Sequence, residues 1–185
     1  MSYDFTLFRP KSGVSLEDSV AALHNEQEME AKEGKPLEPS AKGRMDALVA
    51  ALLAATPDLE VADHTADALG YIELNRKGNQ NGIQITVHAN SANISVPYWH
   101  TKTEAAGVMR EIFGYLKVLE KDGGFRTHDP QLGRVLDVDK DVDEALSAYS
   151  STAEKVTSQV RARPELLSKI SKYNDTKPWW KFWGN

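Results

Sequence analysis

The sequence predicts one α+β domain, in which helices pack on one face of a largely antiparallel sheet and the C-terminal region is helical. Two observations lead to this prediction. Strand-like alternation of apolar and polar residues is concentrated in mid-chain, around 70–98, and helical periodicity flanks it on both sides. The sequence also lacks the regular βαβ alternation and the glycine-rich phosphate loop of a nucleotide-binding sheet.

The central strands are predicted to form a three-stranded meander. In 83–89 the odd positions are apolar, whereas in 92–98 the even positions are apolar, and the change follows Asn90-Ser91. A tight hairpin needs this reversal for both apolar sets to face one core. A third alternating run, 70–74, precedes the turn-forming segment 78–82.

Helices and shorter strands are expected around the meander. A strand covers 3–8, and Ser15 with Asp18 resembles a capping box at the start of a helix. Helical spacing then recurs, and two short strands surround a turn, which gives the order β-α-α-β-β-β-α-β-β-α. The expected helices cover 40–55, 104–121 and the region from Asp139 to Val160, and the short strands cover 125–128 and 134–136. Residues 1–162 form the predicted domain, and 163–185 form a C-terminal helix and Trp-rich tail expected to pack on it.

Composition narrows the class of function. The formal net charge of −5 over 185 residues disfavours nucleic-acid binding, because neutralising phosphates needs a basic face. The chain has no cysteine, which excludes disulfides, zinc–thiolate sites, iron–sulfur clusters and thiol nucleophiles. Since the sequence shows neither a signal peptide nor a membrane-length apolar stretch, we expect a cytoplasmic protein.

The acidic segment Asp137–Glu144 is similar to the start of a calcium-binding loop but differs at two essential positions. Such a loop needs Gly at its sixth position and Glu at its twelfth, where this chain has Val142 and Ala148. Acidic residues at the start of a helix instead cap free N–H groups and complement the helix dipole. We therefore expect no metal here, and no motif in the sequence indicates a cofactor.

Three histidines suggest a polar site. His88 lies on the polar side of the predicted hairpin, His100 follows its second strand, and His128 lies in a nearby predicted strand. If those strands are adjacent, the imidazoles converge with Glu73 or Asp129, and such a group could support acid–base chemistry or ligand binding. The simpler interpretation is that these residues lie on the solvated side of a half-covered sheet.

Two segments are candidate partner-binding sites. The second half of the first predicted helix has almost no large apolar residue and carries four acids: Glu26, Glu28, Glu30 and Glu33. The tail carries four aromatic residues beside two lysines: Trp179, Trp180, Phe182 and Trp183. This tail can cover a groove of the core, form an aromatic hot spot for a protein partner, or lie at a membrane interface. Two lysines are too few for stable membrane anchoring alone.

Two stretches, Met1–Phe8 and Asp129–Asp137, resemble segments of small bacterial proteins. Some of those proteins are similar to immunity proteins, which neutralise toxins delivered between competing cells. The resemblance implies a bacterial origin and assigns no site residue.

The leading hypothesis is a non-catalytic protein-binding module, an immunity-type inhibitor whose acidic groups occlude the cleft of a toxin. It depends on the negative charge, the acidic half-helix and the lack of catalytic motifs. One alternative is a small enzyme or ligand-binding domain that uses the polar face of the 83–98 hairpin. Another is peripheral membrane association through the 177–183 tail.

Overall fold

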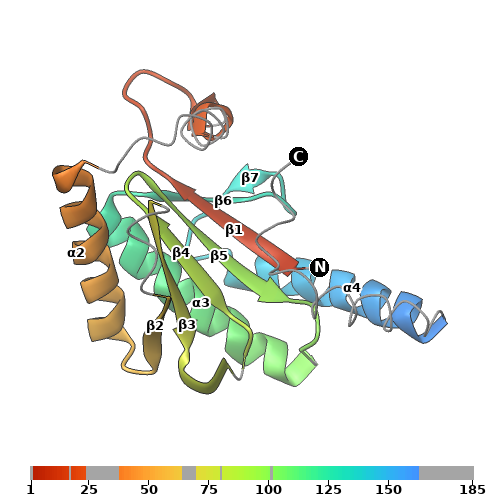
Figure 1. The fold of residues 1–185 in the computed structure, drawn as a ribbon. Helices are drawn as coiled ribbons and strands as arrows, with labels where there is room; N and C mark the ends of the chain where they lie inside the picture. Colours follow the sequence, from red (N-terminus) through yellow and green to blue (C-terminus); the bar gives the residue numbers. More distant parts are fainter. Residues whose placement is uncertain are drawn as a thin grey trace.

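The fold is built on one open antiparallel sheet. The structure is a computed structural model, and it describes residues 2–16, 18–23, 38–63, 70–79, 81–100 and 102–162. Its seven strands follow the order β2-β3-β4-β5-β1-β6-β7 (Figure 1). They are β1 (Ser2–Phe8), β2 (Leu59–Asp63), β3 (Tyr71–Arg76), β4 (Gln84–His88), β5 (Ser91–Pro97), β6 (Arg126–Asp129) and β7 (Arg134–Val135). The helices with described bounds are α2 (Pro39–Ala55), α3 (Lys102–Gly123) and α4 (Val142–Ala162), and residues 16 and 18–23 are also helical.

The first strand lies inside the sheet rather than at its edge. β1 pairs with β5 along its whole length, from Ser2 opposite Pro97 to Phe8 opposite Ser91. On its other side it pairs with β6, where Thr6 lies opposite His128. The N-terminal strand therefore joins the central meander to the late hairpin of β6 and β7, which would otherwise be separate.

Apolar side chains on one side of the sheet form the core. Phe5, Ile94, Ile85 and Leu74 are register neighbours on β1, β5, β4 and β3, and all are fully buried. Helices α2, α3 and α4 contribute to the same cluster through residues such as Leu52, Ile112 and Tyr149. Burying a large apolar side chain contributes roughly 1.5–3 kcal/mol, so this layer dominates the stability of the fold. Figure 1 shows the three helices against this side of the sheet.

The predicted fold class is confirmed, as are several local predictions. The parity change at the β4–β5 hairpin places Ile85, Val87, Ala92 and Ile94 together in the core. Ser15 accepts a hydrogen bond from the backbone N–H of Asp18 at 3.0 Å, which is the expected helix cap. Gly124 follows α3 with a positive φ of 64°, the left-handed conformation that a glycine terminator supplies.

One strand was missed by the sequence analysis. β2 pairs with β3 at the edge of the sheet, and its register shifts between Val61 and Asp63. The run Leu59–Asp63 is short and ends in an irregularity, so its alternation does not stand out from a loop.

Among the described residues, no helix combines the length and apolar character needed to cross a membrane.

Candidate binding face

The side of the sheet opposite α2, α3 and α4 is polar, and we call it the open face. It follows directly from the register, because residues paired across antiparallel strands project to the same side. One continuous row crosses six strands in the order Glu73, Thr86, Asn93, Thr6, His128 and Val135. A second row crosses five strands in the order Glu60, Asn75, Gln84, Ser95 and Asp4.

Within the described parts of the chain, the helical segment 16 and 18–23 is the element that packs on the open face, and it covers one corner. Val20 and Leu23 form a small buried cluster with Phe8, and Leu16 and Val135 pack against it. Phe8 and Val135 are open-face positions on β1 and β7. Because the cluster lies at the end of β1, the two polar rows across β3, β4 and β5 lie outside it.

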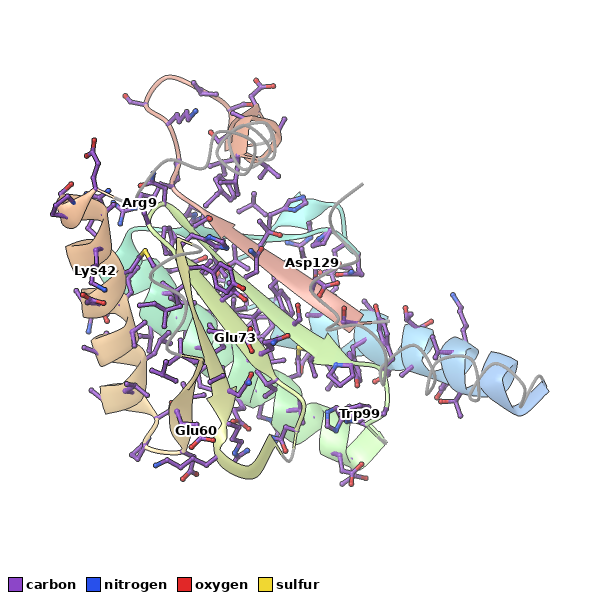
Figure 2. The ribbon with its side chains drawn as sticks, viewed as in Figure 1. Arg9, Lys42, Glu60, Glu73, Trp99 and Asp129 are labelled. Atoms are coloured by element: carbon purple, nitrogen blue, oxygen red, sulfur yellow. The ribbon has the colours of Figure 1, made fainter. Side chains whose placement is uncertain are left out.

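The open face carries negative charge. Asp4, Glu60 and Glu73 project from β1, β2 and β3, and Figure 2 labels two of them, Glu60 and Glu73. On this side, strands β1 to β5 present no lysine or arginine among their described side chains. The adjoining polar positions are amides and hydroxyls, so the charge is not neutralised within those strands.

Cross-strand hydrogen bonds fix two of these carboxylates. Asp4 Oδ1 accepts hydrogen bonds from Ser95 Oγ at 2.6 Å and from Ser2 Oγ at 2.9 Å. Glu73 Oε1 accepts a hydrogen bond from Gln84 Nε2 at 2.6 Å. Charge-assisted bonds of this kind are among the stronger hydrogen bonds in proteins, so both acids are held in defined positions.

His88 is on the open face but adds no positive charge at neutral pH. Its ring lies 5.6 Å from the ring of Tyr71, measured between centroids, on the neighbouring strand. Burial lowers the pKa of His88 to about 4, because a partly desolvated imidazole resists protonation. The imidazole is therefore neutral at pH 7.

The expected convergence of three histidines is wrong. His88 and His128 lie on β4 and β6, with β5 and β1 between them, so three strand spacings alone separate them by about 14 Å, and the register adds an offset along the strands. His100 follows the other end of β5, where its Nε2 donates to the carbonyl oxygen of Asn81 at 2.8 Å. Glu73 shares a row with His128 but is four strands away from it. The insertion of β1 between β5 and β6 causes the separation.

Trp99 is an aromatic feature that the sequence analysis did not single out. Its side chain is 65% exposed and lies just beyond β5 (Figure 2). Gly82 packs closely against the ring, since a Cβ at that position would lie 2.6 Å from Trp99 Cζ2. The alternation of β5, in which odd residues face away from the core, was the signal that could have placed Trp99 at the margin of the open face.

The acidic segment before α4 forms a turn that its own carboxylates stabilise, and the capping of free N–H groups of α4 stays a prediction. Asp141 Oδ2 accepts hydrogen bonds from the Asp137 backbone N–H at 2.7 Å and from Arg134 Nη1 at 2.7 Å. The bond from Arg134 holds the pKa of Asp141 below its usual range. No group of three or more acids or histidines in the described ranges is arranged to hold a metal ion.

Several predicted site residues lie outside the described residues. These are the acids Glu26, Glu28, Glu30 and Glu33, and the tail aromatics Trp179, Trp180, Phe182 and Trp183. The predicted C-terminal region 163–185 lies outside them as well.

A scan of the chain against protein-family models found no match, and searches of curated proteins and of solved structures found none either.

Proposed function

We propose that this protein is a non-catalytic binding module whose open face binds a basic protein surface, in the manner of an immunity-type inhibitor of a bacterial toxin. One observation carries the proposal: Asp4, Glu60 and Glu73 project from a broad sheet face on which strands β1 to β5 present no described lysine or arginine. Complementary charge speeds association and discourages partners of like charge.

The other groups on this face are suited to recognition. Amides and hydroxyls such as Gln84, Thr86 and Asn93 provide donors and acceptors on rigid strands. Trp99 adds an exposed aromatic side chain at the margin, and tryptophan is enriched among residues that dominate binding free energy. The separation of His88, His100 and His128 favours binding over acid–base chemistry as the use of this face.

The first experiment tests the immunity hypothesis in cells of the native host. The product of the gene adjacent to this one is expressed with and without the present chain, and growth is measured. We expect growth arrest that co-expression relieves. If the adjacent product is harmless, or if it stays toxic in the presence of this chain, the immunity proposal fails.

The second experiment tests the surface with the purified pair. Association and dissociation rates are measured for the wild type, for the double variant Glu60→Gln/Glu73→Gln and for Trp99→Ala. We expect the double variant to associate roughly tenfold more slowly at about 50 mM salt, and the difference to shrink at about 500 mM, where screening is strong. We expect Trp99→Ala to dissociate about 10- to 100-fold faster.

The control for charge is Asp122→Asn/Asp143→Asn, which removes the same net charge at exposed positions on α3 and α4, away from the open face. It should associate at nearly the wild-type rate. Equal slowing of both double variants would show that net charge, rather than the open face, controls binding.

A further inference from the structure

The connection between β3 and β4 contains the only Asn-Gly pair of the sequence, Asn81-Gly82. An asparagine side chain that precedes glycine is open to attack by the next backbone nitrogen, because glycine has no side chain to hinder the approach. This reaction, deamidation, is one reason why asparagine is a thermolabile residue. Both residues are described in the structure, and both are partly exposed to water. The connection is therefore a candidate site of covalent modification.

The backbone N–H of Gly82 is the attacking group, and it makes no hydrogen bond with a described residue. The ladder between β4 and β5 begins beyond it, where Gln84 pairs with Ser95. Gly82 has a positive φ of 61°, and a Cβ on it would lie 2.6 Å from Trp99 Cζ2. The backbone angle and the Trp99 ring therefore both require glycine here, and the nitrogen that deamidation needs is available.

Two contacts hold Asn81 in a geometry that resists the reaction. Its Nδ2 donates to Glu111 Oε2 on α3 at 3.0 Å, and its backbone carbonyl oxygen accepts from His100 Nε2 at 2.8 Å. Attack requires the side chain and the following peptide plane to rotate until the Gly82 nitrogen meets Asn81 Cγ. The first contact fixes the side chain and the second fixes the peptide plane. Local opening of the Glu111 contact is the step that frees the side chain to react.

We propose that Asn81 is a deamidation site, that Glu111 controls the rate, and that the product displaces the Trp99 ring. After the Glu111 contact opens, the Gly82 nitrogen bonds to Asn81 Cγ and the Cγ–Nδ2 bond breaks. Nδ2 leaves as ammonia, with the proton that the Gly82 nitrogen gives up. Water then adds to either carbonyl of the cyclic imide and opens it to aspartate or isoaspartate. The reaction needs only water, so the proposal does not depend on the proposed protein partner.

The product adds a charge to a crowded ionic group. Arg76 Nη1 donates to the same Glu111 Oε2 at 2.7 Å, and Arg76 Nη2 lies 3.6 Å from Asp58 Oδ2. A carboxylate at position 81 replaces a donor to Glu111 by a third anion near one guanidinium, and like charges at this distance repel. Because Gly82 follows directly and packs against the Trp99 ring, this repulsion should move the ring.

The first experiment measures deamidation in the full chain by mass spectrometry. The protein is kept at mildly alkaline pH and physiological temperature, sampled over weeks and digested, and the fragment with Asn81 is scored for replacement of NH₂ by OH. The free peptide of residues 76–88 is the unfolded reference. We expect the wild type to react at least about tenfold more slowly than the peptide, and Glu111→Ala to react about tenfold faster than the wild type, because a hydrogen bond to a charged group shifts an equilibrium by about this factor.

A matched control separates the Glu111 contact from a general loss of stability. Gly123→Ala, at the end of the same helix, places a Cβ 2.6 Å from Phe125 Cδ2 and destabilises the fold without touching the connection. It should deamidate as the wild type does. Glu111→Gln removes only the charge and should accelerate the reaction by a smaller factor, so it tests the contact even if Glu111→Ala unfolds. A folded Glu111→Ala chain that reacts at the wild-type rate, equal acceleration by Gly123→Ala, or a wild-type rate equal to that of the peptide would overturn the proposal.

The second experiment tests the effect of the product on Trp99. The indole N–H resonance of Trp99, assigned by its absence in Trp99→Phe, is recorded by ¹H–¹⁵N NMR for the wild type, for Asn81→Asp and for Asn81→Ser. We expect a large shift in Asn81→Asp and a smaller one in Asn81→Ser, which loses the same donor without adding a charge. An unchanged resonance in Asn81→Asp, or equal shifts in both variants, would overturn the link between the new charge and the ring.

Discussion

Tyr3 Oη donates a hydrogen bond to Asp129 Oδ2 at 2.5 Å, and this bond joins residues 126 positions apart inside the core. Asp129 Oδ1 accepts hydrogen bonds from the backbone N–H groups of Gln131 and Leu132, at 2.8 and 3.1 Å. The buried carboxylate therefore ties the first strand to the turn between β6 and β7. Burial and the Asp129 carboxylate raise the pKa of Tyr3, so the hydroxyl remains a donor at physiological pH.

The bond between Tyr3 and Asp129 gives the first prediction. Tyr3→Phe should lower the free energy of unfolding by about 1–3 kcal/mol, because it leaves a buried charged acceptor short of one donor. Urea denaturation measures the loss. In the Asp129→Ala background the same substitution should cost much less, and a loss that is independent of residue 129 would contradict this account.

Two glycines of α3 give a prediction with opposite signs. A Cβ at Gly123 would lie 2.6 Å from Phe125 Cδ2 and 3.2 Å from Leu48 Cδ2, so Gly123→Ala should destabilise the fold by about 1–3 kcal/mol. At Gly114, an exposed position in the same helix, a Cβ would meet nothing within 4 Å. Gly114→Ala should raise stability by about 0.5–1 kcal/mol. Thermal unfolding would contradict the packing argument if both variants changed stability in the same direction.

His88 gives a prediction about pH. Its pKa is about 4 in the folded state and about 6.5 in an unfolded chain, so the unfolded state takes up a proton first as the pH falls. The contribution of His88 to stability should therefore be constant above pH 6.5 and should fall between about pH 6.5 and 4. An NMR titration of the ring Cε1–H should give a midpoint near 4, and a midpoint near 6.5 would show that the imidazole is well solvated.

Glu111 on α3 gives a prediction about the connection between β3 and β4, to which its carboxylate is bonded. Its carboxylate accepts hydrogen bonds from Arg76 Nη1 at 2.7 Å, Asn81 Nδ2 at 3.0 Å and Tyr115 Oη at 2.5 Å. Glu111→Ala should cost about 1–3 kcal/mol of unfolding free energy, because three partly buried donors lose one shared acceptor. Asp122→Ala, at an exposed position near the end of the same helix, is the control and should change stability by less than about 0.5 kcal/mol.

Local patterns predicted local structure well. The parity change around Asn90 specified the hairpin, and Ser15 with Asp18 specified a helix start, because each depends on neighbours within a few residues. The same reasoning predicted that the acids before α4 cap that helix. Asp143 and Glu144 lie in its first turn, whereas the Asp137 backbone N–H that donates to Asp141 lies before the helix begins.

Long-range pairing was not predictable in this way. Nothing in Tyr3–Phe8 states that its neighbours are β5 and β6, which begin 83 or more residues later than Phe8. That pairing separates His88 from His128, and it also places Asp4 in the same row as Glu60 and on the same face as Glu73. The burial of Asp129 could not be predicted for the same reason. A carboxylate is buried where a hydrogen-bond donor satisfies it, and here that donor is Tyr3, which is distant in the sequence.

The two outer strands of the sheet affect how copies of the protein meet at high concentration. A long straight edge invites backbone pairing with another chain and so promotes aggregation. Here β7 has two residues, and β2 changes register between Val61 and Asp63. Such edges offer few aligned backbone N–H and C=O groups for pairing with another chain. We therefore expect the wide polar sheet to make contacts through its side chains rather than through backbone pairing at its outer strands.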